Sequence, residues 1–191
     1  MLDKVVTRKS WSQEKRRLLE LIRERSLIVG GPFKLASGGV SNFYLDMKPV
    51  TFSPEGQYLL AEIIHGLLRE YPDVEAVGGL ELGAVPIIVL VSARSWRERP
   101  IEGFVVRKEQ KGHGTDKRID GNFKRNSTVL LFEDVTTKGS SVMQAVRAVR
   151  EQGAKVRTVI TIVDRLEGAE EKLKHEAIEL IAIFTKDDLL S

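Results

Sequence analysis

The sequence predicts one α/β domain, spanning residues 1–191, with a central and mainly parallel sheet flanked by helices. Short apolar runs typical of buried strands alternate along the chain with amphipathic stretches typical of helices. A chain of 191 residues with 42% apolar content is long enough for one sizeable core. Several apolar runs also end in glycine-rich or charged segments, as parallel strands do where ligands collect at their carboxyl ends.

Each element has its own signal in the sequence. Ser10 and Gln13 form a capping-box pattern ahead of a first helix, and Ser53-Pro54 predicts the start of a second helix that ends at Tyr71-Pro72. Gly153 is expected to cap a later helix. The remaining elements are strands at 76–79, 103–106, 128–132, 156–163 and 178–184, and helices at 86–95 and 142–152.

The segment 128–141, TVLLFEDVTTKGSS, is the most informative about chemistry. Its apolar run predicts a buried strand, with Glu133 and Asp134 at the carboxyl end and a helix beginning near Val142. The small-residue loop between them offers backbone N–H groups and hydroxyls to a phosphate. The carboxylates need a ribose or a Mg²⁺ ion opposite them. The alternative is that the two acids only end the strand and cap the helix.

Other classes of protein lose support from the sequence. The chain has no Gly-Lys dipeptide for a Walker A loop, and Gly112-His113-Gly114 lacks the third glycine of a dinucleotide fingerprint. Zero cysteines exclude disulfides, and a net charge of +3 does not indicate a nucleic-acid partner. No apolar run approaches a membrane span or a secretory signal, so we expect a cytoplasmic protein without a membrane partner.

The segment 128–141 resembles the phosphoribosyl pyrophosphate signature of the type I phosphoribosyltransferases, in which two acidic residues precede a Thr- and Gly-rich turn. Two further segments resemble orotate phosphoribosyltransferases in particular. FVVRKEQKGHGTDKRIDG, 104–121, is similar to their mobile catalytic loop, and FKLASGGVSNFYLDMKP, 33–49, to their amino-terminal orotate-side segment. The resemblance implies a type I phosphoribosyltransferase fold with an amino-terminal hood, about residues 1–50.

The resemblance also implies the residues of the donor site. Lys108, Lys111, His113 and Asp134 are expected to be catalytic. Arg107, Lys108, Lys111 and His113 would contact the pyrophosphate, and Glu133 and Asp134 the ribose hydroxyls. The remaining residues expected to bind phosphoribosyl pyrophosphate are Val135, Thr136, Thr137, Lys138, Gly139, Ser140 and Ser141. The loop 78–84 resembles the family's pyrophosphate loop but has no lysine, and a plain turn is its alternative.

The acceptor side is expected to bind orotate. Arg165, at the end of the strand VRTVITIVDR, resembles the family's orotate-binding arginine, whose planar fork matches a carboxylate or an imide edge. Thr137, Phe43, Tyr44 and Lys48 complete the expected set. Packing on an edge strand is the alternative for the two aromatic residues. Lys34 and Lys48 are alternatives for a lysine that some relatives carry where Ala36 stands.

The activity implied is transfer of a ribosyl phosphate from phosphoribosyl pyrophosphate to orotate, in pyrimidine biosynthesis. Mg²⁺ is the implied cofactor, carried by the donor near Glu133 and Asp134 without a direct metal site in the protein. A homodimer is implied, in which the loop of one subunit acts in its neighbour's site. The alternatives are a phosphoribosyltransferase for another base and a non-catalytic regulator that senses phosphoribosyl pyrophosphate.

Overall fold

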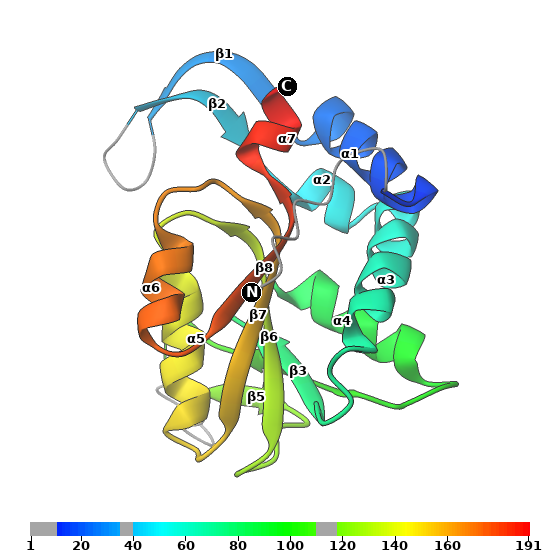
Figure 1. The fold of residues 1–191 in the computed structure, drawn as a ribbon, viewed down its shortest axis with the longest axis vertical. Coiled ribbons are helices and arrows are strands. Elements are labelled where there is room, and N and C mark those ends of the chain that lie inside the picture. The colour runs from blue at the N-terminus through cyan, green and yellow to red at the C-terminus, as the bar shows by residue number, and fades with distance from the viewer. Residues whose placement is uncertain (1–10, 35–39, 110–117) are drawn as a thin grey trace.

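A six-stranded sheet runs through the protein in the computed structural model, which describes residues 11–34, 40–109 and 118–191 (Figure 1). The strand order is β5-β4-β3-β6-β7-β8, and every neighbouring pair is parallel except the antiparallel pair β4–β5. The strands are β3 (Ala76–Gly79), β4 (Glu102–Val106), β5 (Ile119–Gly121), β6 (Thr128–Thr136), β7 (Lys155–Asp164) and β8 (Glu179–Thr185). The predicted α/β class and mainly parallel sheet are confirmed.

Helices cover both faces of this sheet (Figure 1). On one face lie α1 (Gln13–Arg25), α3 (Pro54–Leu68) and α4 (Val85–Ser95), and on the other lie α5 (Ser140–Arg150) and α6 (Ala169–His175). Two short helices, α2 (Lys48–Thr51) and α7 (Lys186–Leu190), lie near α1. Among the described residues, no helix is both long and apolar enough to span a membrane.

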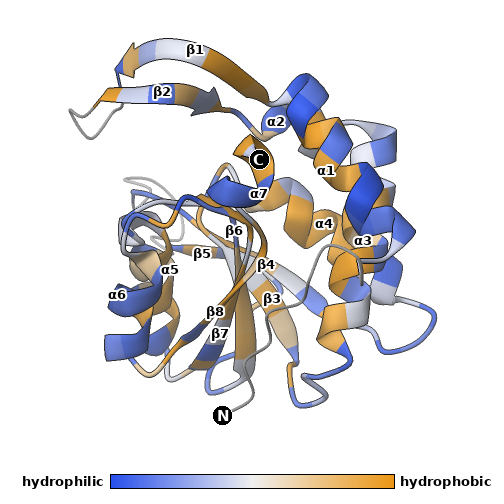
Figure 2. Cartoon of the chain, turned by 45° about the horizontal axis from the view of Figure 1, so that its top comes forward, coloured by the Kyte–Doolittle hydropathy of each residue, from blue (hydrophilic) through white to orange (hydrophobic). Residues whose placement is uncertain are grey.

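The sheet separates two hydrophobic cores because side chains alternate along each strand. In β6, Leu130 and Phe132 pack with the α1, α3 and α4 side, and Val129 and Leu131 pack with the α5 side. All four are at most 1% exposed. Apolar strands between polar outer helix surfaces are visible in Figure 2. The continuous apolar run of β6 is therefore explained by burial on both faces.

The helix starts show which sequence signals were correct. Ser53 caps α3 as predicted, and its Oγ accepts a hydrogen bond from the Gly56 N–H at 3.0 Å. The first helix is capped by Ser12, whose Oγ accepts from the Lys15 N–H at 3.2 Å. Ser10 lies outside the described residues.

A separate antiparallel hairpin, β1 (Leu27–Lys34) and β2 (Val40–Leu45), lies over the carboxyl ends of the sheet strands (Figure 1). Its strands alternate between half-buried and exposed residues for most of their length. One face of the hairpin is thus turned toward the rest of the protein. The segment belongs to the predicted hood, whose extent of about residues 1–50 stays a prediction.

Candidate active site

The carboxyl ends of β3, β6 and β7 meet at one edge of the sheet. Gly79 of β3 pairs with Phe132 of β6, and Thr136 of β6 pairs with Asp164 of β7. The segments that follow these strands, 80–84, 137–139 and 165–168, therefore leave the sheet at the same edge. Ligands of open parallel sheets bind at this edge, so a site is expected here.

The acidic pair lies within β6, not after its end as predicted. The strand continues through Thr136 because its backbone ladder with β7 runs on to Asp164. Glu133 is 7% exposed, and its Oε2 has no hydrogen-bond partner among the described residues. Burial, reinforced by the charge of Asp134, raises the pKa of Glu133 well above its ordinary value.

Asp134 lies against the loop that follows β3. Its Oδ1 accepts a hydrogen bond from the Val135 N–H at 2.8 Å. A Cβ atom added at Gly83 would collide with the Asp134 carboxylate. The loop 80–84 thus passes so close to the carboxylate that only glycine fits at position 83 without moving it.

A cavity of about 330 Å³ opens beside this carboxylate. It contains two cationic side chains, Lys48 and Lys108, and three acidic ones, Glu81, Glu133 and Asp134. The other lining residues are Leu80, Leu82, Gly83, Val135 and Ser141. The predicted acidic pair, one lysine of the basic segment and one lysine of the amino-terminal segment therefore share one space.

The loop after β6 forms a second, smaller hollow of about 20 Å³, room for roughly one water molecule. It is lined by Glu133, Val135, Thr136, Thr137, Gly139, Ser140, Ser141 and Val142. Gly139 has φ +70°, which turns the chain into α5 without a side-chain cap. This helix begins at Ser140, two residues before the predicted Val142. The uncapped amides of its first turn and the hydroxyls beside them are suited to an anion.

Two side chains outside the predicted set contact this loop. The Thr136 Oγ1 donates a hydrogen bond to Asp164 Oδ1 at 2.9 Å, which ties the loop to β7. The Lys172 Nζ, from α6, donates to the Ser140 Oγ at 3.2 Å. The exposed Lys138 is not among the residues that line the hollow. Nothing in the local sequence around Lys172 indicates this contact, because α6 reaches the loop only through tertiary packing.

The basic segment is described only at its two ends. Lys108 lines the cavity, and its backbone N–H donates to Glu81 Oε1 at 2.9 Å. Arg107 is paired with Asp120 of β5 through its Nε at 2.5 Å, and it does not line the cavity. Lys111 and His113 lie outside the described residues.

The turn after β7 presents Arg165, whose side chain is 7% exposed. Its guanidinium lies 4.4 Å from the centroid of the Phe43 ring. Tyr44 follows on the same strand, points to the opposite face and is 43% exposed, so the two aromatic residues do not share one surface. Of the predicted aromatic pair, only Phe43 contacts Arg165.

Lys48 begins α2 beneath the hairpin and pairs with Asp46, with 2.6 Å between Nζ and Oδ1. This hydrogen bond raises the pKa of Lys48, and Tyr44 and Asp134 add a smaller charge effect. Lys48 therefore carries positive charge at the wall of the cavity. Its neighbour Asp46 was not predicted, although the Asp-x-Lys spacing is visible in the sequence.

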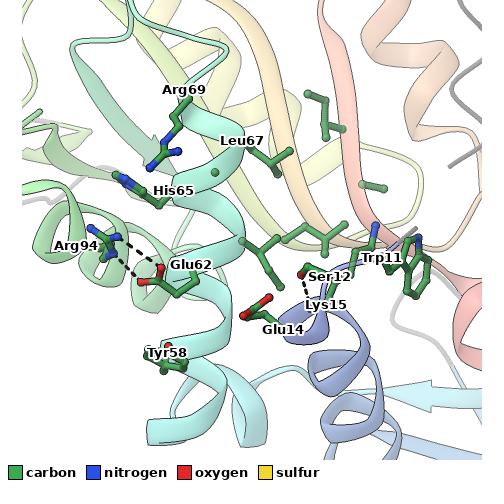
Figure 3. A pocket seen from close by; sticks show the side chains of 15 residues that line it. Trp11, Ser12, Glu14, Lys15, Tyr58, Glu62, His65, Leu67, Arg69 and Arg94 are labelled. Carbon is green, nitrogen blue, oxygen red and sulfur yellow. Dashed lines mark hydrogen bonds and ion pairs between the residues drawn. The ribbon is translucent and has the colours of Figure 1, made fainter. Parts of the chain in front are cut away.

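A larger cavity of about 560 Å³ lies elsewhere, between α1, α3, α4 and β8 (Figure 3). Three of its polar side chains, Arg94, Glu62 and His65, are held in pairs. Arg94 Nε is 2.7 Å from Glu62 Oε1, a pair marked in Figure 3. His65 Nε2 is 2.9 Å from Oε2 of Glu98, which lies outside the cavity lining. None of the loops at the carboxyl edge of the sheet lines it. We therefore assign the candidate site to the cavity beside Asp134.

Comparisons with known proteins show what the chain as a whole is similar to. No family model matches the chain. The orotate phosphoribosyltransferase of Aquifex aeolicus is 43% identical to it over 93% of the chain and 98% of the relative, and that of Methanocaldococcus jannaschii is also 43% identical with the same coverage. The orotate phosphoribosyltransferase of Mycobacterium tuberculosis, solved with Fe(III) dicitrate, superposes with a TM-score of 0.82 at 34% identity, covering 93% of this chain and 99% of that one. The same enzyme solved with phosphoribosyl pyrophosphate gives a TM-score of 0.77.

Proposed function

The chain belongs to the orotate phosphoribosyltransferase family, and on this premise we propose how its residues divide the work of the reaction. The protein is a pentosyltransferase of pyrimidine biosynthesis. It moves the ribosyl 5-phosphate of phosphoribosyl pyrophosphate to orotate and releases pyrophosphate. The bond from ribose C1 to a pyrophosphate oxygen breaks, and a bond from C1 to a ring nitrogen of orotate forms. One observation carries the assignment of roles: the acidic pair, the phosphate loop and the turn of Arg165 meet at one edge of the sheet.

Asp134 is the residue that we propose faces the reacting ribose. Positive charge develops on the ribose as the pyrophosphate leaves, and a fixed carboxylate opposes it. Asp134 lines the cavity of about 330 Å³ and is confined by Gly83, which supports this role. Glu133 would accept a ribose hydroxyl at its Oε2, the buried atom without a partner among the described residues.

The loop after β6 would bind the 5-phosphate of both substrate and product. Backbone amides at the start of α5 and hydroxyl groups surround the small hollow there, and Glu133 is the one acidic residue among the described residues that line it. The residues in this role are Val135, Thr136, Thr137, Lys138, Gly139, Ser140 and Ser141. Thr136 contributes through its backbone, because its hydroxyl is bonded to Asp164.

The leaving pyrophosphate would be neutralised by cations of the basic segment. Lys108 lines the cavity, and its backbone is anchored on Glu81. Lys111 and His113 are proposed for the same task from the family resemblance alone. Arg107 is bonded to Asp120, so it would have to release this carboxylate before it could bind the pyrophosphate.

Orotate would be held at the turn after β7. Arg165 offers a planar fork to its carboxylate or imide edge, and Phe43 contacts this fork. Thr137 follows Thr136, whose carbonyl accepts from the Arg165 N–H at 2.9 Å. Lys48 is proposed for orotate from the family resemblance. Tyr44, the remaining predicted contact, points away from Arg165 on its strand.

Mg²⁺ is the cofactor that we propose, delivered with the pyrophosphate of the donor. The described residues hold no group of three side chains that could bind a metal unaided. Glu133 Oε2, which has no partner within the described part of the chain, and the carboxylate of Asp134 are nevertheless the oxygen donors that Mg²⁺ prefers. When bound, the ion supplies positive charge against the departing pyrophosphate.

We further propose that the protein is a cytoplasmic homodimer, in which the segment containing Lys111 acts in the partner's site. The test of base choice is a spectrophotometric assay of the purified protein with orotate, uracil, hypoxanthine and adenine. Orotate should be consumed only when phosphoribosyl pyrophosphate and Mg²⁺ are both present. Faster consumption of a purine would refute the proposed acceptor site.

A further inference from the structure

Arg165 is held by three contacts before any ligand arrives. Its Nε donates a hydrogen bond to Glu167 Oε1 at 2.8 Å, and its Nη2 donates to the Ser41 Oγ at 3.2 Å. The plane of the guanidinium also lies against Phe43, 4.4 Å from the ring centroid. These contacts come from two places in the chain, the turn after β7 and strand β2.

The backbone of the turn brings Glu167 back toward Arg165. Leu166 has φ +56°, a conformation that costs energy for a residue with a bulky side chain. The turn is held by Asp164, whose Oδ1 accepts from the Leu166 N–H at 3.2 Å and from the Thr136 Oγ1 at 2.9 Å. A strained turn that aims one carboxylate at one guanidinium is the kind of arrangement found at functional sites.

The contacts leave one edge of the guanidinium unused. Among the described residues, Nη1 has no hydrogen-bond partner, while Nε and Nη2 are both engaged. A guanidinium has five N–H groups in one rigid plane, and it recognises a ligand only when that plane is oriented toward the ligand. Glu167 and Ser41 fix its rotation, and Phe43 fixes its tilt.

We propose that Glu167 is a positioning residue for the acceptor base: it holds the Arg165 fork so that the Nη1 edge faces orotate. This inference rests on the proposed function, in which Arg165 binds orotate. Glu167 itself does not touch the substrate. Its carboxylate also offsets part of the charge of Arg165, which has little access to water.

A purely structural role is the alternative. Arg165 joins the hairpin to the main sheet through Ser41 and Phe43, so Glu167 would then serve only to hold the two parts together. Loss of a structural link lowers the thermal midpoint and disturbs both substrates. Loss of a positioning contact affects the base alone.

The test compares Glu167→Ala with Glu167→Gln, whose side-chain oxygen can still accept from the Arg165 Nε. We expect Glu167→Ala to raise the KM for orotate about tenfold, in the range of coupling within one hydrogen-bond network. The KM for phosphoribosyl pyrophosphate should stay within about twofold, and Glu167→Gln should restore most of the loss. Ser41→Ala, which removes the second contact, should raise the KM for orotate about threefold and gives a second test if Glu167→Ala does not fold.

Arg165→Ala separates failure of this inference from failure of the proposed function. If Arg165→Ala raises the KM for orotate and Glu167→Ala does not, the positioning role is overturned and the role of Arg165 stands. If Arg165→Ala leaves that KM unchanged, the proposed contact with orotate is itself wrong. Equal increases for both substrates in Glu167→Ala, with a lower thermal midpoint, would mean that Glu167 only links the hairpin to the sheet.

Discussion

Replacing Gly83 with alanine should disable the site while leaving the fold nearly intact. The new Cβ would lie within 3.0 Å of Oδ1, Cγ and Oδ2 of Asp134, which real Cβ atoms essentially never do. The backbone of Gly83 is not in the left-handed region, so alanine adds no strain there. The collision is with the end of a side chain, and Asp134 can relieve it by rotating away.

Gly83→Ala should affect turnover much more than it affects the free energy of unfolding. A carboxylate displaced by about 1 Å from its working position can cost a factor of about 100 in turnover. A side chain forced off its rotamer lowers the free energy of unfolding by about 0.5 to 1.5 kcal/mol. Replacing glycine by alanine restricts the unfolded chain, which raises the free energy of unfolding by about 0.4 to 1 kcal/mol. The free energy of unfolding should therefore change by less than about 1 kcal/mol, or roughly 2 to 4 °C in thermal midpoint for a chain of this size.

The assay is steady-state turnover of orotate with saturating phosphoribosyl pyrophosphate, alongside thermal unfolding. Gly66→Ala is the matched control, because a Cβ there meets nothing within 4 Å. It lies inside α3, so alanine should stabilise the protein by about 0.5 to 1 kcal/mol without affecting turnover. Turnover within twofold of wild type in Gly83→Ala would refute the argument that Asp134 must stay where it is.

Three further predictions concern the same site. Asp134→Asn keeps the shape of the side chain but removes its charge, so turnover should fall sharply at an unchanged thermal midpoint; normal turnover would favour the capping interpretation of the acidic pair. Because the folded pKa of Glu133 lies above its ordinary value of 4.5, the folded state binds more protons above that pH, and wild-type stability should decline as pH rises. Glu133→Gln should flatten this decline when urea unfolding is followed from pH 4.5 upward, and identical pH profiles would contradict it. Mixed Lys111→Ala and Asp134→Asn proteins should recover up to about a quarter of wild-type activity if subunits exchange randomly, because half of the dimers would carry one intact composite site. No recovery, with exchange verified by native mass spectrometry, would contradict action across the interface.

The sheet was predictable because its strands are apolar runs buried on both faces. Their ends were less predictable. Glu133 and Asp134 suggested that β6 had finished, yet main-chain pairing with β7 continues through Thr136 regardless of side-chain polarity. Strand β5 has only three residues and exists through its pairing with β4, a contact that local sequence does not encode.

The site was predicted in the same uneven way. Parallel strands bring their carboxyl ends together, so the acidic pair, the phosphate loop and Arg165 were expected to converge, and they do. The partners of the predicted cations were not foreseen. Asp120 reaches Arg107 because β5 pairs with β4. Glu167 reaches Arg165 because Leu166 adopts a left-handed backbone conformation, which leucine disfavours.

The pairing of Thr136 with Asp164 has a consequence for how base choice can evolve. One ladder of main-chain hydrogen bonds sets the separation between the donor loop and the acceptor turn, and main-chain bonds do not depend on which side chains the two segments carry. Substitutions in 165–168 can therefore change which base is bound without moving the loop that binds the sugar phosphate. The sheet thus fixes the distance between the two binding segments, so that binding of the sugar phosphate can stay constant while recognition of the base varies.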